Sequence, residues 1–192
     1  MIDSARGIGF GLGSSVAGRT YSDTPCGTTN IGHYGGAITN NVIVARDPRL
    51  FASNAGFDTG IGLEQSCETS IWHNTVVSTT APRSSSIEWR FTNTSASIAN
   101  NLVSHNLLAR DDGRAVTVGN VTNAPLSLFV DVAGADLHLI SSAAIAIDKA
   151  VALTPPLATD LDSEPRGSAP DVGADEYYPT SFPNPTRHRG PQ

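Results

Sequence analysis

The sequence predicts an all-β solenoid, in which short strands repeat in stacked coils. The main observation is a repeated pattern: an aliphatic residue, Asn three positions later, and then two mostly apolar residues. It occurs as I-T-N-N-V-I-V, I-W-H-N-T-V-V and I-A-N-N-L-V-S, which aligns Asn41, Asn74 and Asn101. A strand-like segment that recurs about every 30 residues is typical of solenoid proteins. The 18 Gly and 12 Pro residues, with abundant Ser, Thr and Asn, also suit a turn-rich all-β chain.

A second repeated element supplies another strand of each coil. It occurs at residues 7–11, 60–64, 86–90 and 115–119, where apolar residues alternate with small, polar or charged ones. Alternation with a period of two indicates a strand with one buried face. Stacked in register, these strands predict two inward ladders: Ile8, Ile61, Ile87 and Val116 in the first, and Phe10, Leu63, Trp89 and Val118 in the second.

The three aligned asparagines predict a hydrogen-bonded ladder at one turn of the coil. Asn tolerates the left-handed backbone conformation that a sharp bend requires. Its side-chain amide can both donate and accept along the stack of coils. We therefore interpret Asn41, Asn74 and Asn101 as structural residues rather than ligand-binding ones.

The sequence divides into three parts. Coils are predicted over residues 1–149, a capping segment over 150–178 and a flexible tail over 179–192, where the chain is Pro-rich and irregular. A long insertion rich in Gly, Thr and Ser, at about residues 14–32, interrupts the first coil. Loops of this length are usually functional or disordered.

Charge and composition exclude some partners. The net charge of −6 and the absence of a Lys/Arg cluster exclude nucleic acid as an expected partner. No run approaches the roughly 18 apolar residues of a membrane span, so no membrane span is expected. Cys26 and Cys67 are either a disulfide, if the protein is exported, or two buried thiols.

The first residues, M-I-D-S-A-R-G-I-G-F-G-L-G, enter strand-like sequence almost at once. They show no basic region followed by an apolar one, so no signal peptide is visible and we interpret the start as a truncation. The first coil would then expose unpaired strand edges and apolar core. Such an edge favours association, so we expect either further coils or a second copy to cover it.

The C-terminal sequence resembles that of secreted bacterial right-handed β-helix repeat proteins, which have the pectate-lyase-like superfold. Its segments A-I-D-K-A, D-L-D-S-E-P-R and P-D-V-G-A-D-E-Y are similar to the family pattern, although Ala150 and Ser163 stand where that pattern usually has Gly. The resemblance implies a right-handed parallel β-helix, which we expect to have about four to six coils and an irregular C-terminal cap. It also implies a secreted or cell-surface protein.

The resemblance implies no single activity, because this superfold carries lyases, hydrolases, epimerases and non-catalytic proteins. The first hypothesis is an extracellular polysaccharide lyase or hydrolase, or a truncated part of one. The alternative is a non-catalytic module that binds glycans or mediates adhesion. Both hypotheses give a polysaccharide or glycan as the partner.

Three charged residues are the candidate catalytic group. Glu64 and Arg90 occupy equivalent outward positions on neighbouring coils and are expected to form a cross-strand ion pair, with Glu88 on the same exposed sheet. A glycoside hydrolase needs two carboxylates held roughly 5–10 Å apart. A lyase needs a base near the uronate α-proton and a cation that neutralises the carboxylate. A surface ion pair without catalytic function is the competing interpretation.

Histidine and aromatic residues are the candidates for substrate binding. His33 and Tyr34 lie next to the long insertion, and Trp72 and His73 lie beside the aligned Asn74. Aromatic rings stack on sugar rings where they are exposed, and a pair such as His73 and His105 can act as acid and base. The competing interpretation is that these residues only decorate outward turns.

The acidic C-terminal segment has two interpretations. It contains six carboxylates: Asp160, Asp162, Glu164, Asp171, Asp175 and Glu176. Several oxygen ligands on a flexible loop suit calcium, which is the one cofactor that the sequence suggests. The favoured interpretation is that these carboxylates pair with Arg166 and cap the turns of the last coil, so that no cofactor or metal site is expected.

Overall fold

The computed structural model describes residues 1–11, 19–28 and 30–179. The predicted tail from residue 180 onward and residues 14–18 and 29 of the predicted insertion lie outside these ranges. Helix is limited to three short 3₁₀ segments in the described part: η1 (Pro25–Gly27), η2 (Pro48–Phe51) and η3 (Leu126–Leu128). Because the other elements are strands, the all-β class is confirmed. None of the helices in these ranges is long and apolar enough to cross a membrane.

The strands that carry the architecture form three parallel sheets. Sheet 1 is ordered β1-β7-β11-β14, sheet 2 is ordered β15-β12-β9-β5, and sheet 3 is ordered β13-β10-β6. Their bounds are β1 (Arg6–Phe10), β5 (Ala37–Thr39), β6 (Val42–Ala45), β7 (Thr59–Glu64), β9 (Thr69–Trp72), β10 (Thr75–Ser78), β11 (Ser85–Arg90), β12 (Ser95–Ala99), β13 (Leu102–Val103), β14 (Leu107–Arg110) and β15 (Arg114–Val118).

The remaining strands are shorter or lie outside the three sheets. They are β2 (Arg19–Thr20), β3 (Asn30–Ile31), β4 (His33–Tyr34), β8 (Ser66–Cys67), β16 (Phe129–Asp131) and β17 (Asp136–Leu139). β4 and β8 are parallel and lie in the turn from sheet 1 to sheet 2. A disulfide joins Cys26, in η1, to Cys67, in β8, so the two cysteines are not free thiols.

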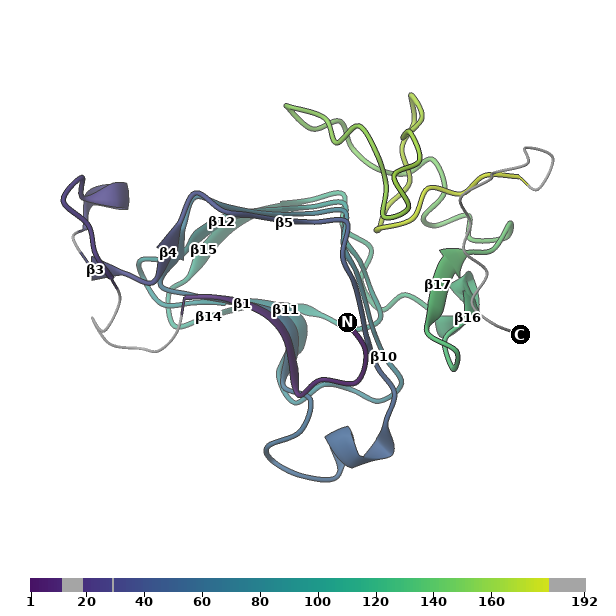
Figure 1. Ribbon diagram of the computed structural model, residues 1–192, viewed down its shortest axis with the longest axis horizontal. Helices are drawn as coiled ribbons and strands as arrows, with labels where there is room; N and C mark the ends of the chain where they lie inside the picture. Colours follow the sequence, from purple (N-terminus) through teal and green to yellow (C-terminus); the bar gives the residue numbers. More distant parts are fainter. Residues whose placement is uncertain (12–18, 29, 180–192) are drawn as a thin grey trace.

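The chain visits the three sheets in one order and then repeats it. In the described residues, three circuits pass from sheet 1 to sheet 2 and then to sheet 3 before they return to sheet 1. A fourth has strands β14 and β15 and reaches sheet 3 only through the bridge between Leu102 and Val121. Figure 1 looks along the stack, so strands of successive circuits overlie one another and outline a closed cross-section. Parallel pairing of each strand with the strand one circuit later explains this superposition.

The predicted inward ladders are correct for three circuits and wrong for the fourth. Ile8, Ile61 and Ile87 are register partners in sheet 1, but the next partner is Leu107. Val116 lies instead in sheet 2 and is 72% exposed. Alternation shows that a segment is a strand, but it does not show to which sheet the strand belongs. Ile87 and its next partner Leu107 are only 20 residues apart, against 26 for Ile61 and Ile87, so residues 115–119 already belong to the following strand, in sheet 2.

The predicted asparagine ladder is present and extends one residue further. Asn41 Nδ2 donates to Asn74 Oδ1 at 3.0 Å, and Asn74 Nδ2 donates to Asn101 Oδ1 at 2.9 Å. Asn101 Nδ2 in turn donates to Asn120 Oδ1 at 2.8 Å. Asn120 was not predicted, because Thr117 stands where the repeated pattern has an aliphatic residue.

Apolar residues cover both faces of sheet 3. On each strand one residue faces the interior of the stack, such as Ile43 or Val76, and its neighbour faces outward, such as Val44 or Val77. Strands that are buried on both faces have continuous apolar runs, which accounts for the paired apolar residues of the repeat. The outward row therefore has to be covered by another part of the chain.

The C-terminal segment covers this outward row. The chain leaves the three sheets after Val121, not at residue 149 as predicted. Residues 122–179 then lie beside sheet 3 rather than over the end of the stack (Figure 1). They add an apolar cluster to which Phe129, Leu139 and Val172 belong. The predicted cap is therefore a lateral cover that crosses several circuits.

We predict that replacing Asn74 by Ala lowers the free energy of unfolding by roughly 2–4 kcal/mol. The side chain is fully buried, and its loss leaves the backbone N–H of Asn41 and the carbonyl of Ile38 without their partner. Urea denaturation measures the effect. The control is Asn106→Ala, at an exposed position, with an expected change below about 0.5 kcal/mol. Equal losses in the two variants would contradict a special role of the ladder.

Candidate functional site

The outward face of sheet 1 brings charged residues together. Because Ile61, Leu63, Ile87 and Trp89 are buried in the core, the residues that alternate with them point away from it. Register places Glu64, Arg90 and Arg110 in one row across β7, β11 and β14. The neighbouring row contains Glu88 opposite Gly62. We call Arg6, Asp58, Glu64, Glu88, Arg90 and Arg110 the charged strip.

Ion pairs connect the members of the charged strip. The predicted pair of Glu64 with Arg90 is present at 3.7 Å, and Glu64 lies at the same distance from Arg6. Arg6 also contacts Asp58 at 2.5 Å, and this hydrogen bond raises the pKa of Arg6 although burial opposes the shift. Glu88 accepts from Arg110 at 3.1 Å. The strip therefore brings opposite charges into contact across neighbouring strands.

The two glutamates are more covered than the sequence suggested. Glu64 is 7% exposed and Glu88 only 1%, although both were expected on an exposed sheet. Gly62 presents no side chain, and a Cβ there would lie 4.0 Å from Glu88 Cγ and 3.3 Å from a methyl group of Thr59. Glu88 therefore lies over the glycine, where Ser84 donates a hydrogen bond to it at 2.5 Å.

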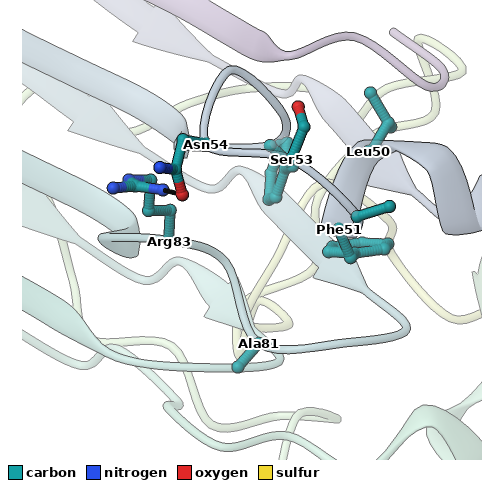
Figure 2. A pocket seen from close by; sticks show the side chains of 8 residues that line it. Leu50, Phe51, Ser53, Asn54, Ala81 and Arg83 are labelled. Atoms are coloured by element: carbon teal, nitrogen blue, oxygen red, sulfur yellow. Dashed lines mark hydrogen bonds between the residues drawn. The ribbon is translucent and has the colours of Figure 1, made fainter.

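Two neighbouring hollows lie near the end of the strip where β7 and β11 begin, and the smaller of the two is lined by members of the strip. Figure 2 shows the larger, of about 430 Å³, with Leu50 and Phe51 on one side and Asn54 and Arg83 on the other. The second, of about 310 Å³, shares Asn54 and Arg83 and extends to Arg6 and Asp58. Arg83 donates a hydrogen bond to Asn54 between them. Together the hollows lead from aromatic side chains to the charged strip.

His33 and Tyr34 lie on β4, just beyond sheet 1. The ring of His33 packs against Phe10 with centroids 4.2 Å apart, and burial lowers the pKa of His33. Tyr34 is 39% exposed, contacts Tyr21 edge to face at 5.0 Å and donates to Asp23 at 3.2 Å. These two residues therefore belong to the disulfide-linked loop and not to the charged strip.

Trp72 and His73 also lie away from the charged strip. Trp72 belongs to sheet 2, where its indole N–H donates to Ser97 at 2.9 Å. His105 lies beyond sheet 3, and its Nδ1 is 3.1 Å from the Ser78 hydroxyl. The structure therefore does not bring His73 and His105 together as an acid and base on one face with Glu64.

His73 occupies a backbone position that explains its surroundings. Its φ of 52° is left-handed, as is the φ of Asn40, Asn100 and Gly119 at the equivalent positions of the other circuits. The side chain is 2% exposed, with Nδ1 3.1 Å from the carbonyl of Asp171 and Nε2 3.0 Å from the amide of Asn100. Burial lowers the pKa of His73 to about 4, so the ring is neutral at pH 7.

Most of the acidic C-terminal residues cap backbone groups. Asp160 accepts from the N–H groups of Asp162, Glu164 and Glu176. Asp171 accepts from two backbone N–H groups, and Glu176 pairs with Arg166 at 3.3 Å. These contacts agree with the favoured interpretation of the segment as a cap.

His138 stands apart from these capping contacts and was not recognised from the sequence. It lies on β17 between Asp136 and Asp162, at 2.5 Å and 2.7 Å. Burial opposes its positive charge, but the hydrogen bonds to Asp162 and Asp136 outweigh burial and raise its pKa to about 9.

The sequence did not reveal Arg6, Asp58, Arg83 or Arg110 as members of the site. Arg6 and Asp58 are 52 residues apart, and only the sheet register brings them together. In β14, whose sequence is L-L-A-R, apolar and polar residues hardly alternate, so the outward position of Arg110 was not predicted. The sheet 1 register, once known, would have located all but Arg83.

The comparisons with known proteins add no assignment. No protein-family model, no curated protein and no solved structure matches this chain. The function has to be argued from the arrangement of the charged strip and the hollows beside it.

We predict that His73 makes stability fall as the pH is lowered. Unfolded His73 takes up a proton near pH 6.5 and the folded side chain only near pH 4, so the unfolded state binds more protons between these values. This difference in proton binding lowers the free energy of unfolding by about 2 kcal/mol at pH 4.5 relative to pH 7.5. The variant His73→Asn should lack this pH-dependent loss because Asn does not titrate. Asn also suits the backbone there, since it is native at two equivalent positions with left-handed φ.

Urea denaturation of both proteins at the two pH values measures the difference. Burial raises the pKa of Asp171 to about 6, so this residue makes stability rise as the pH falls. Asp171 is present in both proteins, so its contribution cancels when the two are compared. The stability gap between wild type and His73→Asn should shift in favour of the variant at pH 4.5. An identical gap at both pH values would contradict a neutral buried His73.

Proposed function

We propose that this chain is a right-handed parallel β-helix of the pectate-lyase-like type that acts on a polysaccharide. The repeated order of three parallel sheets and the asparagine ladder support the β-helix. The C-terminal segments that resemble the family pattern support the assignment to the pectate-lyase-like type. The Cys26–Cys67 disulfide supports an exported protein, because disulfides persist in oxidising compartments.

The charged strip is the observation that carries the proposed activity. Its residues come from successive parallel strands, which lie about 4.8 Å apart. A linear polymer can therefore run across the strands and meet charged groups at each circuit. The hollows that contain Arg83 and Phe51 continue this path and offer a cation and an aromatic ring for further sugar units.

Glu64 is the residue to which we assign proton transfer. It is a neighbour of Arg90 on the next strand and lies 3.7 Å from both Arg6 and Arg90. In a lyase, Glu64 would take the α-proton of a uronate while an arginine neutralises the carboxylate. The glycosidic C–O bond would break as the C=C bond forms, and the leaving oxygen would take a proton from water. In a hydrolase, Glu64 and Glu88 would serve as the two carboxylates.

A second candidate function is glycan binding without catalysis. The observation that favours it is that Glu64 and Glu88 both contact arginines, and Glu88 is almost completely buried. A strip of paired charges can hydrogen-bond sugar hydroxyls without transferring a proton. The two functions differ in whether product forms, so one experiment separates them.

We predict turnover of a polysaccharide that depends on Glu64. The full chain is incubated with uronate-containing and neutral polysaccharides, and both unsaturated-product absorbance and new reducing ends are recorded. Glu64→Gln should reduce the rate at least 100-fold, since general acid–base groups contribute about 10²–10⁴-fold. Arg90→Ala should weaken binding and turnover of uronate polymers more than of neutral ones.

Matched controls lie away from the charged strip. Glu68 is exposed in the turn after β8, and Arg114 is exposed on β15, so Glu68→Gln and Arg114→Ala should keep the wild-type rate. Binding without product on any substrate would favour the second candidate. Neither binding nor product on the whole panel would contradict both functions.

A further inference from the structure

The β16–β17 hairpin places a histidine among three carboxylates, outside the charged strip. His138 lies on β17, Asp136 precedes it by two residues, and Asp162 and Asp175 come from the segment that covers sheet 3. One ligand atom each from His138, Asp162 and Asp175 lies within 4.8 Å of the others. We propose that these three side chains bind a divalent transition-metal ion, such as Zn²⁺.

The three atoms lie close enough together for a single ion to reach all of them after a small adjustment. Metal–ligand bonds of about 2.0–2.2 Å require ligand atoms to lie roughly 3–4.4 Å apart. His138 Nε2 and Asp162 Oδ2 are 2.7 Å apart, which is closer than this range, so the two side chains have to rotate slightly apart to admit an ion between them and Asp175. The three residues supply one nitrogen and two carboxylate oxygens.

The surrounding hydrogen bonds have the arrangement of a supporting shell. Asp136 Oδ1 lies 2.5 Å from Nδ1 of His138, which directs the other ring nitrogen, Nε2, toward Asp162 and Asp175. Metal-bound histidines almost always donate their second N–H to a carboxylate, a carbonyl or water. Asp175 is held in place because its Oδ2 accepts from the N–H of Leu139 at 2.7 Å. These contacts hold His138 and Asp175 in orientation through groups that do not themselves bind the ion.

The site is open to solvent on one side. A hollow of about 280 Å³ is lined by Asp136, His138, Leu161 and Gly134. It provides a path for the ion and room for water to complete the coordination. Because an imidazole nitrogen is one of three ligands, the donor set suits Zn²⁺ better than Ca²⁺ or Mg²⁺, which take oxygen ligands.

The ion would join parts of the chain that are separate in sequence. His138 belongs to the hairpin, whereas Asp162 and Asp175 belong to two later turns of the cover over sheet 3. A ligand that binds only the folded state raises stability in proportion to the logarithm of its concentration. Metal binding should therefore raise the midpoint of thermal unfolding.

The test is metal binding by the full chain after treatment with a chelator. Equilibrium dialysis and calorimetric titration with Zn²⁺ should give one bound ion per chain, and Zn²⁺ should raise the Tm by several degrees. Equal concentrations of Ca²⁺ and Mg²⁺ should not. His138→Gln and Asp162→Asn should each weaken Zn²⁺ binding at least tenfold, while His105→Gln, at a site beyond sheet 3, should bind as the wild type does.

Dialysis is carried out below the unfolding temperature of each variant, so that lower stability alone does not mimic lost binding. Circular dichroism confirms that each variant is folded during the measurement. The absence of bound Zn²⁺ in the wild type would overturn the proposal and leave His138 as part of an ion-pair network only. Undiminished binding in both His138→Gln and Asp162→Asn would overturn it equally.

Discussion

The structure depends on the hydrogen bonds of the asparagine ladder. At each turn between sheet 2 and sheet 3 the backbone bends sharply, and buried N–H and C=O groups lose their strand partners. The side chain of Asn74 accepts from the N–H of Asn41 and donates to the carbonyl of Ile38, and it also donates to the side chain of Asn101. Each amide therefore fixes the height of one circuit on the next. Buried polar groups left unpaired would cost about 1–3 kcal/mol each, so a shift of a circuit is strongly disfavoured.

The register that the ladder holds also builds the charged strip. Glu64 meets Arg90 only because β7 and β11 pair without a shift, and Arg110 meets Glu88 for the same reason on β14. A slip of one residue would turn these side chains into the core and the core residues outward. The scaffold and the candidate site are therefore consequences of one constraint, although they lie on different sheets.

The sequence predicted the repeated features and missed those that occur once. The Asn positions and the Ile8, Ile61 and Ile87 ladder were predictable because each recurs with one residue pattern. The fourth circuit was misassigned at Val116 because it begins sooner than the repeat predicts, at Leu107, and because a strand pattern does not identify the sheet to which the strand belongs. Asn120 was missed because its circuit lacks the aliphatic residue that marks the repeat. Predictions fail here where the repeat itself becomes irregular.

The lateral position of the C-terminal cover was also not predicted, yet the signal was present. The paired apolar residues after each Asn, such as Val76 and Val77, face opposite sides of sheet 3. Two apolar faces require a cover on the outer side as well as a core on the inner side. His138, Asp162 and Asp175 come together through contacts between the hairpin and later turns of the cover, and no local sequence pattern predicts such contacts.

Amide hydrogen exchange at the ladder tests this account most directly. The backbone N–H groups of Asn41, Asn74 and Asn101 each donate to the side chain of the next asparagine rather than to a strand. If these bonds hold the circuits together, the Asn74 and Asn101 amides should exchange as slowly as those of core strand β10, with opening free energies near that of global unfolding. Exchange at rates close to those of exposed turn amides, while β10 stays protected, would contradict the central role of the ladder.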